Sequence, residues 1–200
     1  GAGPVCVTRE LEPFLPVPRV VKEGDGYRLD SGQPQSVGRV HAFHGNYGVL
    51  VRAYSYILSM GEAGLKKASQ LAVLNANYIK EQLKDVLHLP YDRPCMHECV
   101  FSDLKQQEVK IGTVDMAKRL IDYGYHPPTI YFPLIVHGAM MIEPTETECK
   151  DDIDQFIATL KIITQEAVEQ PELLRQAPQR TKVRRLDEVQ AARCACLIGP

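Results

Sequence analysis

The pattern of hydrophobic and polar positions changes sharply near residue 47. Residues 49–58, with the sequence VLVRAYSYIL, are apolar on nearly every side of a helix, and Arg52 is their one charged residue. A helix with almost no polar face is buried on most sides, between layers or at a subunit interface. Gly61 and Gly64 follow, and we expect them to break this helix.

A second helix is predicted from about residue 65 to residue 87, followed by alternating strands and helices. Its apolar side chains recur at spacings of three and four, whereas lysines occupy the opposite side. The later pattern predicts strands at residues 96–101, 129–132 and 139–142. Short strands alternating with long helices indicate a small sheet with helices packed on one face, which is an α+β arrangement.

Polar residues in this region are predicted to cap two helices. Thr113 precedes a helical pattern that stops at Gly124, so Thr113 is the expected N-cap and Gly124 the expected C-terminal stop. Farther on, Thr145 and Glu148 have the spacing of a capping box, with Thr147 as a competing cap. The last clear helix then carries apolar side chains on one face, namely Ile153, Phe156, Ile157, Leu160 and Ile163.

The two ends of the chain differ in composition from its middle. Closely spaced prolines mark residues 1–40 as an extended connector, with a short strand or hairpin near Tyr27. Residues 171–200 are rich in basic side chains and are expected to form an arm on the surface.

Composition and charge exclude several classes of protein. The 200 residues are 44% hydrophobic and 24% charged, which is ordinary for a globular chain. The formal net charge of −2 argues against a general nucleic-acid binder, and no apolar stretch is long enough for a membrane span. No signal peptide is recognisable, so a cytoplasmic location is expected. The start, GAGPVCVTRE, reads like the interior of a longer chain, so a fragment is expected.

Taken alone, the residues do not form a complete catalytic set. The cysteines lack the spacing of a zinc site, and no metal site is predicted. His97 and Glu98 are adjacent in a predicted strand, so they are expected to point to opposite faces, one of them toward the core or a cleft. No serine or cysteine has the sequence context of a nucleophile.

One short stretch, HGNYG at residues 44–48, is open to two interpretations. It stands directly before the apolar helix, where free backbone N–H groups and the helix dipole favour an anion. Asn46 adds a side-chain donor, and Gly45 lacks the Cβ that would keep a phosphate at a distance. A Gly-Asn turn that only caps the helix explains the same residues, and turn statistics favour it.

Several longer stretches together resemble one known family. They are GAGPVCV, LEPFLPVPRV, GRVHAFHGNYGVLVRAYSYILSMG, LNANYI, VDMAKRLIDYGYHPPTIYFPLIV and MIEPTETE. These stretches are similar to the C-terminal part of the glycine-cleavage-system P-protein, or glycine decarboxylase, and especially to the separate second subunit of bacteria that divide the enzyme in two. The resemblance extends from residue 1 to about residue 193, and motifs of this length are specific.

The resemblance implies an α/β fold of the aspartate-aminotransferase-like type with pyridoxal 5'-phosphate as cofactor. Residues 1–60 would form the end of the cofactor-binding large domain, a connector and a buried inter-domain helix. Residues 61–170 would form the C-terminal α+β small domain, and residues 171–200 an arm. In the family, the cofactor-binding lysine precedes a glycine-rich run whose tail GAGP resembles. That lysine is therefore expected upstream of residue 1, and the chain alone, with no catalytic residue, is expected to be inactive.

The same resemblance shifts the interpretation of HGNYG toward an anion site. In related folds the equivalent helix start reaches across a dimer to the cofactor phosphate of the neighbouring subunit. Gly45, Asn46 and Tyr47 occupy that place here and are expected to contact the phosphate.

The resemblance also implies a substrate pocket that includes His97, Thr129 and Met141. Relatives with aminotransferase activity often hold the substrate carboxylate with an arginine in a late strand, where this chain has AMMIEP. A decarboxylase gains from an apolar wall there, because an ion pair would stabilise the carboxylate more than the transition state in which its charge leaves. Alternatively, the two methionines only fill the core of the small domain.

The implied function is decarboxylation of glycine with transfer of the aminomethyl group to the lipoyl group of the H-protein. The implied partners are the first subunit of the P-protein, the lipoylated H-protein and glycine, with neither nucleic acid nor a membrane. The alternative is a non-catalytic α+β interaction module or remnant subunit. The basic arm either steers an acidic carrier or wraps its own or the partner subunit, and the second interpretation is favoured.

Overall fold

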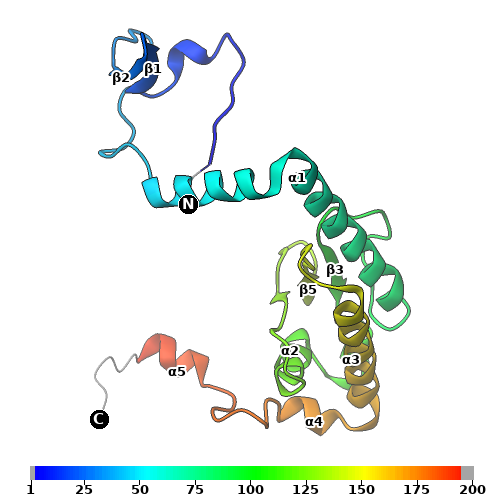
Figure 1. The fold of residues 1–200 in the computed structure, drawn as a ribbon. Helices are drawn as coiled ribbons and strands as arrows, with labels where there is room; N and C mark the ends of the chain where they lie inside the picture. Colours follow the sequence, from blue (N-terminus) through cyan, green and yellow to red (C-terminus); the bar gives the residue numbers. More distant parts are fainter. Residues whose placement is uncertain (1–2, 195–200) are drawn as a thin grey trace. The chain divides into compact units, whose positions relative to one another are not determined.

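The computed structural model describes residues 3–194 and divides into two compact units. The first unit comprises residues 1–62 and the second unit residues 63–200. The division lies next to Gly61, where the longest helix is kinked (Figure 1).

The first unit contains a short 3-10 helix, Glu12–Phe14, and one hairpin. Strands β1, Arg19–Glu23, and β2, Gly26–Asp30, pair in antiparallel register across a two-residue turn. Gly24 opens this turn with φ +61°, a left-handed conformation that glycine adopts without strain. The hairpin predicted near Tyr27 is confirmed.

Helix α1, Tyr47–Leu83, is a helix of 37 residues with a kink inside it. Gly61 departs from helical geometry, with φ 61° and ψ 179°. The break predicted at Gly61 is therefore confirmed as a kink, whereas the break predicted at Gly64 is wrong, because helical structure continues through it. The second part ends about one turn before residue 87, the predicted end.

The first part of α1 is not buried by the described residues of this chain, and its expected burial between layers or at a subunit interface stays a prediction. Its apolar side chains face solvent, with Val49 41% exposed and Leu58 64% exposed. The rest of the first unit that the structure describes is one hairpin, one 3-10 helix and loops. These offer too little apolar surface to enclose a helix without a polar face, so its burial requires additional polypeptide.

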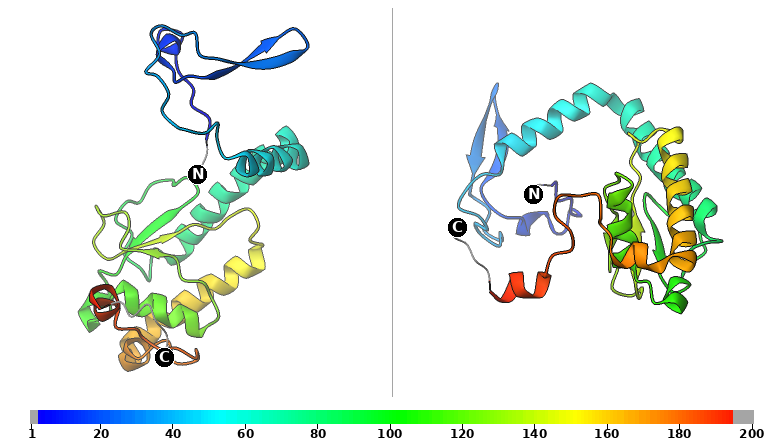
Figure 2. Two further views of the ribbon diagram at one scale, coloured as in Figure 1. Left: turned by 90° about the vertical axis from the view of Figure 1, so that its left-hand side faces the viewer. Right: turned by 90° about the horizontal axis from the view of Figure 1, so that it is seen from below.

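The second unit is built on a small antiparallel sheet (Figure 2). This sheet has three strands in the order β3-β5-β4. The strands are β3, Cys99–Ser102, β4, Thr129–Ile130, and β5, Ala139–Ile142. All three predicted strands are present. Two of them are shorter than expected, and β3 begins at Cys99 rather than at residue 96.

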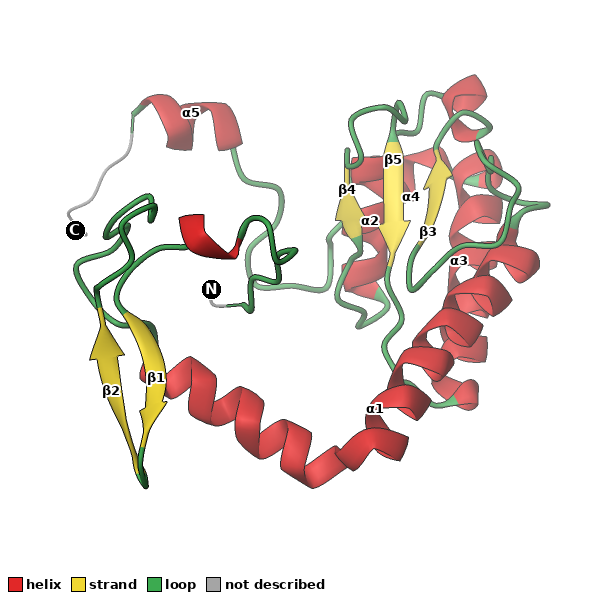
Figure 3. Ribbon diagram, turned by 90° about the horizontal axis from the view of Figure 1, so that it is seen from above, coloured by secondary structure: helices red, strands yellow, loops and turns green. Residues whose placement is uncertain are grey.

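Helices pack against one face of this sheet and enclose the core (Figure 3). They are the second part of α1, α2 at Thr113–Asp122 and α3 at Lys150–Glu169, with a 3-10 turn at Gln106–Val109. The fully buried side chains of this core include Leu83, Phe101, Leu120, Met140, Leu160 and Ile163. The predicted α+β class is confirmed for this unit.

The C-terminal segment begins inside the core. Helix α4, Pro171–Arg175, follows α3 directly, and Leu174 and Ala177 are fully buried. The expectation of a surface arm from residue 171 is therefore wrong for its first residues, because α4 packs against α2 and α3. Farther on, α5 at Glu188–Arg193 contributes no buried residue.

The predicted cap of α2 is wrong, although its predicted stop is confirmed. Thr113 is the first residue of the helix, and its hydroxyl donates to the carbonyl of Gly138 at 2.6 Å. The N-cap position belongs to Gly112, whose N–H donates to the Asp115 carboxylate at 3.0 Å. Gly124 follows the end of the helix with φ +87°, a conformation suited to glycine.

The predicted capping box before α3 is also absent. The helix begins after Cys149, two residues beyond Thr147. The hydroxyls of Thr145 and Thr147 instead form a hydrogen bond with each other at 2.6 Å. A later helix start puts both threonines outside the position from which a side chain caps a first turn.

A largely buried charge network ties α2 to α3 and to the C-terminal segment. Arg119 donates to both oxygens of Glu166 at 2.8 Å, and Tyr123 donates to the same carboxylate at 2.7 Å. The Asp122 carboxylate accepts the backbone N–H groups of residues 179–180 at 2.7 and 2.8 Å. The hydrogen bonds from Arg119 hold the pKa of Glu166 below its ordinary value of 4.5.

Replacing Glu166 by Gln is expected to lower the free energy of unfolding by about 1.5–3 kcal/mol at pH 7, because charge-assisted hydrogen bonds are lost. The pKa of Glu166 is lowered in the folded state. Its stabilisation is therefore fully present above the unfolded pKa and is lost as the pH falls through the folded pKa. The difference between parent and variant, measured by urea denaturation, should shrink below about pH 4.5.

The matched control is Glu169→Gln, at an exposed position one turn farther along α3. This variant should change the free energy of unfolding by less than about 0.5 kcal/mol. Equal losses for the two variants, or a Glu166→Gln effect that does not change with pH, would contradict the role assigned to the network.

Candidate functional site

Three side chains form a row across the sheet, on the face that points away from the core. The strand register places Val100 opposite Met141, and Met141 opposite Thr129. Side chains alternate between the two faces of a strand, so this row lies behind the buried pair Phe101 and Met140. Val100 and Met141 are half-buried and Thr129 is exposed. This face is therefore open to a ligand or to another part of the protein.

A hollow of about 420 Å³ adjoins the row, and both Thr129 and Met141 line it. Three carboxylates, Glu143, Glu148 and Asp152, also line it, and no arginine or lysine does so among the described residues. The rest of the wall is mostly apolar or aromatic, formed by Ile79, Tyr125, His126, Pro127, Pro128, Ile142, Pro144, Ile153 and Phe156. Such a hollow suits a small ligand with hydrogen-bond donors or a positive charge.

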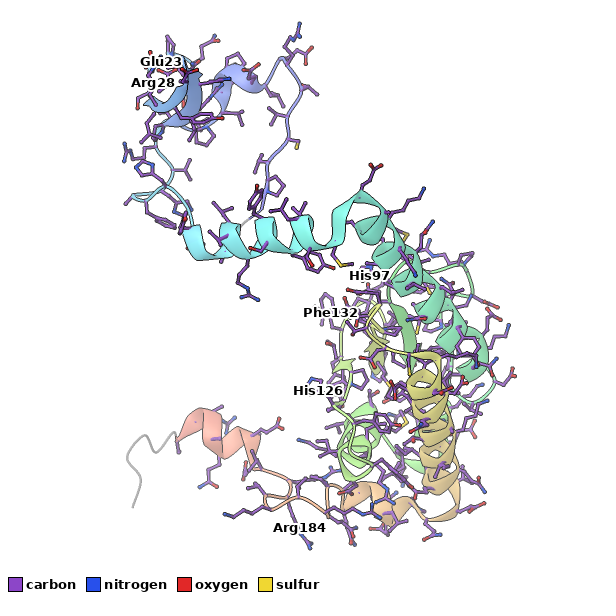
Figure 4. All side chains as sticks on the ribbon, viewed as in Figure 1. Glu23, Arg28, His97, His126, Phe132 and Arg184 are labelled. Atoms are coloured by element: carbon purple, nitrogen blue, oxygen red, sulfur yellow. The ribbon has the colours of Figure 1, made fainter. Side chains whose placement is uncertain are left out.

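His97 lies beside this hollow through its contact with Glu143 (Figure 4). The Nε2 atom of His97 is 3.5 Å from Oε1 of Glu143 and 3.9 Å from Oε2 of Glu98. The expectation that His97 and Glu98 point to opposite faces of a strand is wrong, because β3 begins at Cys99 and leaves both in a loop. The His97 side chain is 55% exposed, so it borders the hollow and is not enclosed by it.

The two methionines of AMMIEP have different environments. Met140 is buried and packs in the core between the sheet and the helices. Met141 is half-buried and lines the hollow. The interpretation as core filling is therefore confirmed for Met140, whereas Met141 adds apolar surface to the hollow.

Gly45, Asn46 and Tyr47 lie in the first unit, at the start of α1. The helix begins at Tyr47, and the carbonyl of Asn46 accepts the N–H of Leu50 at 3.1 Å. Gly45 has φ +110°, which a residue with a side chain rarely adopts. This geometry fits both a turn and an anion site, because the first turn of a helix has N–H groups without an intrahelical acceptor.

Sequence reasoning missed the carboxylates of the hollow. Glu143 follows Met141 by two residues, so the strand period would have placed both on one side. Asp152 lies in the first turn of α3, and no local pattern connects it to the sheet. His126, in the segment between α2 and β4, is exposed and also lies in the wall of the hollow.

The connection from β4 to β5 is fixed at its far end by Asp103. Gly138 has φ +58° and approaches so closely that a Cβ there would lie 1.9 Å from Oδ1 of Asp103. The Gly138 carbonyl accepts the N–H of Asp103 at 3.2 Å and the hydroxyl of Thr113 at 2.6 Å. Oδ2 of Asp103 accepts the N–H of Thr113 at 2.9 Å. The chain therefore enters β5 at a fixed position beside the row of Val100, Met141 and Thr129.

The cysteines of the described residues are free thiols, and Cys196 lies outside those residues. Burial raises the pKa of the Cys99 thiol far above its ordinary value, so Cys99 acts as a small apolar core residue. Across residues 3–194, no group of three or more histidine, cysteine, aspartate or glutamate side chains is placed to hold a metal ion. In the same range no helix is both long enough and apolar enough to cross a membrane.

The fold of the chain matches part of a solved structure. That structure is a crystal structure of glycine decarboxylase (P-protein) of the glycine cleavage system, in inhibitor-bound form. The match has a TM-score of 0.62 and 15% sequence identity, and it covers 78% of this chain and 37% of that chain. At this level of identity the match establishes the fold.

A family model described as glycine dehydrogenase, C-terminal domain, matches residues 68–183. This range is more than half of the chain and contains the whole sheet and the lining of the hollow. The chain belongs to this family of glycine dehydrogenase C-terminal domains.

Bacterial relatives are similar to this chain over nearly its whole length. The probable glycine dehydrogenase (decarboxylating) subunit 2 is 55% identical in Oceanobacillus iheyensis, 58% in Caldanaerobacter subterraneus and 52% in Listeria innocua, in each case over 193 residues. Each match covers 96% of this chain and 40% of the relative. The chain therefore spans about two fifths of the length of these relatives.

Replacing Gly138 by Ala is expected to destabilise the second unit by roughly 2–6 kcal/mol, because left-handed strain and overpacking each cost about 1–3 kcal/mol. The new Cβ would collide with the carboxylate of Asp103, which cannot withdraw without losing its bond to Thr113. Urea denaturation monitored by circular dichroism would measure the loss.

The matched control is Gly124→Ala. Gly124 also has a positive φ, +87°, but an added Cβ there would meet open space. Only backbone strain applies, so the loss should be no more than about 1–3 kcal/mol. If Gly138→Ala is no more destabilising than this control, the close contact with Asp103 is not a constraint on the fold.

Proposed function

We propose that this chain is the C-terminal part of the second subunit of a glycine decarboxylase with an aspartate-aminotransferase-like fold and pyridoxal 5'-phosphate as cofactor. The observation that carries the proposal is 52–58% identity to three bacterial subunit 2 proteins over 96% of the chain. The reaction is decarboxylation of glycine with transfer of the aminomethyl group to the lipoyl group of the H-protein. The name subunit 2 among the relatives supports a first subunit as partner.

In this proposal the cofactor-binding lysine belongs to polypeptide upstream of residue 1, and this chain contributes binding and orientation. Gly45, Asn46 and Tyr47 receive the cofactor phosphate at the N-terminus of α1. The left-handed backbone of Gly45 and the helix start at Tyr47 support this role, because both leave room and N–H donors for an anion. When bound, pyridoxal phosphate supplies the electron sink that departure of carbon dioxide requires.

His97, Thr129 and Met141 form the small-domain side of the substrate pocket. Thr129 offers a hydroxyl donor to a substrate oxygen. Met141 offers apolar surface and no positive charge to the substrate carboxylate. The ground state, in which the carboxylate is charged, is therefore not stabilised at the expense of the transition state. Glu143, with Oε1 3.5 Å from Nε2 of His97, places a carboxylate beside the imidazole at the edge of the hollow.

Only part of the basic C-terminal segment is available to an acidic carrier such as the H-protein. Arg185 donates to Asp115 at 2.7 Å and to the carbonyl of Leu174 at 2.8 Å, so it fastens the segment to its own domain. Lys182 and Arg184 are exposed, and Figure 4 labels Arg184; the two side chains would provide the long-range attraction. This combines the two roles considered for the segment, with the wrapping role carried by Arg185.

The proposal is tested by adding the missing polypeptide. The isolated chain should show no exchange of the glycine carboxyl group with labelled bicarbonate, because the cofactor-binding lysine is absent. A full-length protein that joins this chain to the lysine-bearing part of a relative, mixed with a first subunit, should turn yellow with pyridoxal phosphate and catalyse the exchange. A full-length protein that stays colourless and inactive would favour the interaction module instead.

In that full-length protein, Asn46→Leu is expected to weaken cofactor binding by roughly tenfold to a hundredfold, because losing a hydrogen bond to a charged group costs about 1.5–3 kcal/mol. An absorbance titration with pyridoxal phosphate would measure the change. His41→Leu, just outside the HGNYG stretch, is the control and should leave the affinity unchanged. An unaltered affinity in Asn46→Leu would make HGNYG a simple turn that starts a helix.

A further inference from the structure

The connection between β4 and β5 carries a set of exposed apolar side chains. Within residues 131–135, which we call the apolar loop, Tyr131 is 50% exposed, Phe132 53%, Leu134 87% and Ile135 78%. No charged residue occurs between Thr129 and His137. Contiguous exposed apolar surface of this kind marks a site of contact with other polypeptide.

The apolar loop is held in one conformation by the residues around it. The N–H of Tyr131 donates to the carbonyl of Ala139 at 2.8 Å, and the N–H of Val136 donates to that of Pro133 at 3.0 Å. Val136 is buried beneath the loop, and Gly138 beyond it is held against Asp103. A loop fixed in this way loses little conformational entropy when a partner covers it, so its exposed side chains are preorganised for binding.

The lengths of the relatives indicate what covers this loop. The family model describes a C-terminal domain, and the chain spans 40% of the length of relatives such as that of Caldanaerobacter subterraneus. In those relatives, therefore, this domain is joined to a preceding part that is longer than the domain itself. An uncharged apolar loop suits a permanent contact with that part better than a transient one.

We propose that the apolar loop is the docking surface for the preceding part of the longer polypeptide. That part would contact the loop through an uncharged apolar surface. The inference rests on the proposed function in one respect, namely that the preceding part is the one that carries the cofactor-binding lysine. Because the loop follows directly on strand β4, which contains Thr129, docking there brings that part to the edge of the hollow. The loop thus determines how the two sides of the site come together.

The test compares one pair of substitutions in two contexts. The first context is the isolated chain. The second is a full-length protein in which this chain replaces the matched 193 residues of the Caldanaerobacter subterraneus subunit 2, to which it is 58% identical. In the isolated chain, Leu134→Ala with Ile135→Ala should leave Tm unchanged within about 1 °C, because both side chains are already exposed. In the full-length protein the same pair should lower Tm by roughly 4 °C or more.

The control is Ile162→Ala with Val168→Ala, which removes two exposed aliphatic side chains from α3. This pair should change Tm equally in both contexts. Hydrogen exchange provides a second readout without any substitution. The backbone amides of residues 134–136 should exchange at least tenfold more slowly in the full-length protein than in the isolated chain.

Several results would overturn the proposal. One is an equal change in Tm for Leu134→Ala with Ile135→Ala in the isolated chain and in the full-length protein. Another is equal hydrogen exchange of residues 134–136 in these two proteins. A concentration-dependent dimer of the isolated chain that the loop pair abolishes would assign the loop to a second copy. If Leu134→Ala with Ile135→Ala leaves Tm unchanged but slows aminomethyl transfer to the H-protein, the loop contacts the carrier instead.

Cofactor absorbance separates the docking proposal from the proposed function. If the loop is protected from hydrogen exchange in a colourless full-length protein, only the proposed function is rejected. If the loop is unprotected in a yellow full-length protein, only the docking is rejected.

Discussion

The pairing of β5 with β3 on one side and with β4 on the other is the constraint on which the second unit depends. Val100, Met141 and Thr129 share a row only because β5 stands between strands from distant parts of the chain. The same register turns Phe101 and Met140 into the core. Since the side chains of a strand alternate with a period of two, a slip by one residue would exchange the two sets. The core and the candidate site are therefore specified together.

The fold could be predicted wherever the hydrophobic period is strong. The strand at residues 139–142 has the bounds expected of it, and α3 buries the face that its period predicts. The helix caps could not be predicted, because the hydrogen-bond partner of a polar side chain can come from a distant part of the sequence that only folding brings near. The hydroxyl of Thr113 bonds to the carbonyl of Gly138, 25 residues away, and so does not close its own helix.

The candidate site could be predicted only in part, for a similar reason. Thr129 and Met141 adjoin each other as strand neighbours, and His97 comes near them through Glu143. Asp152 joins the same hollow from a helix that starts well after the sheet ends, so packing alone brings it there. The cofactor and the substrate proposed for this site come from the resemblance to a family, because neither the hydrophobic period nor the residue spacing indicates them.

Burial explains why one unit is self-sufficient and the other is not. The second unit surrounds Leu120, Leu160 and their neighbours on all sides, so its folding free energy comes from contacts within residues 63–194. The apolar residues 49–58 are not enclosed in this way in the first unit. The hydrophobic pattern of a helix predicts that the helix is buried, but it does not indicate which polypeptide buries it. The structure therefore adds to the sequence a distinction between apolar residues that the described chain encloses and apolar residues that it leaves exposed.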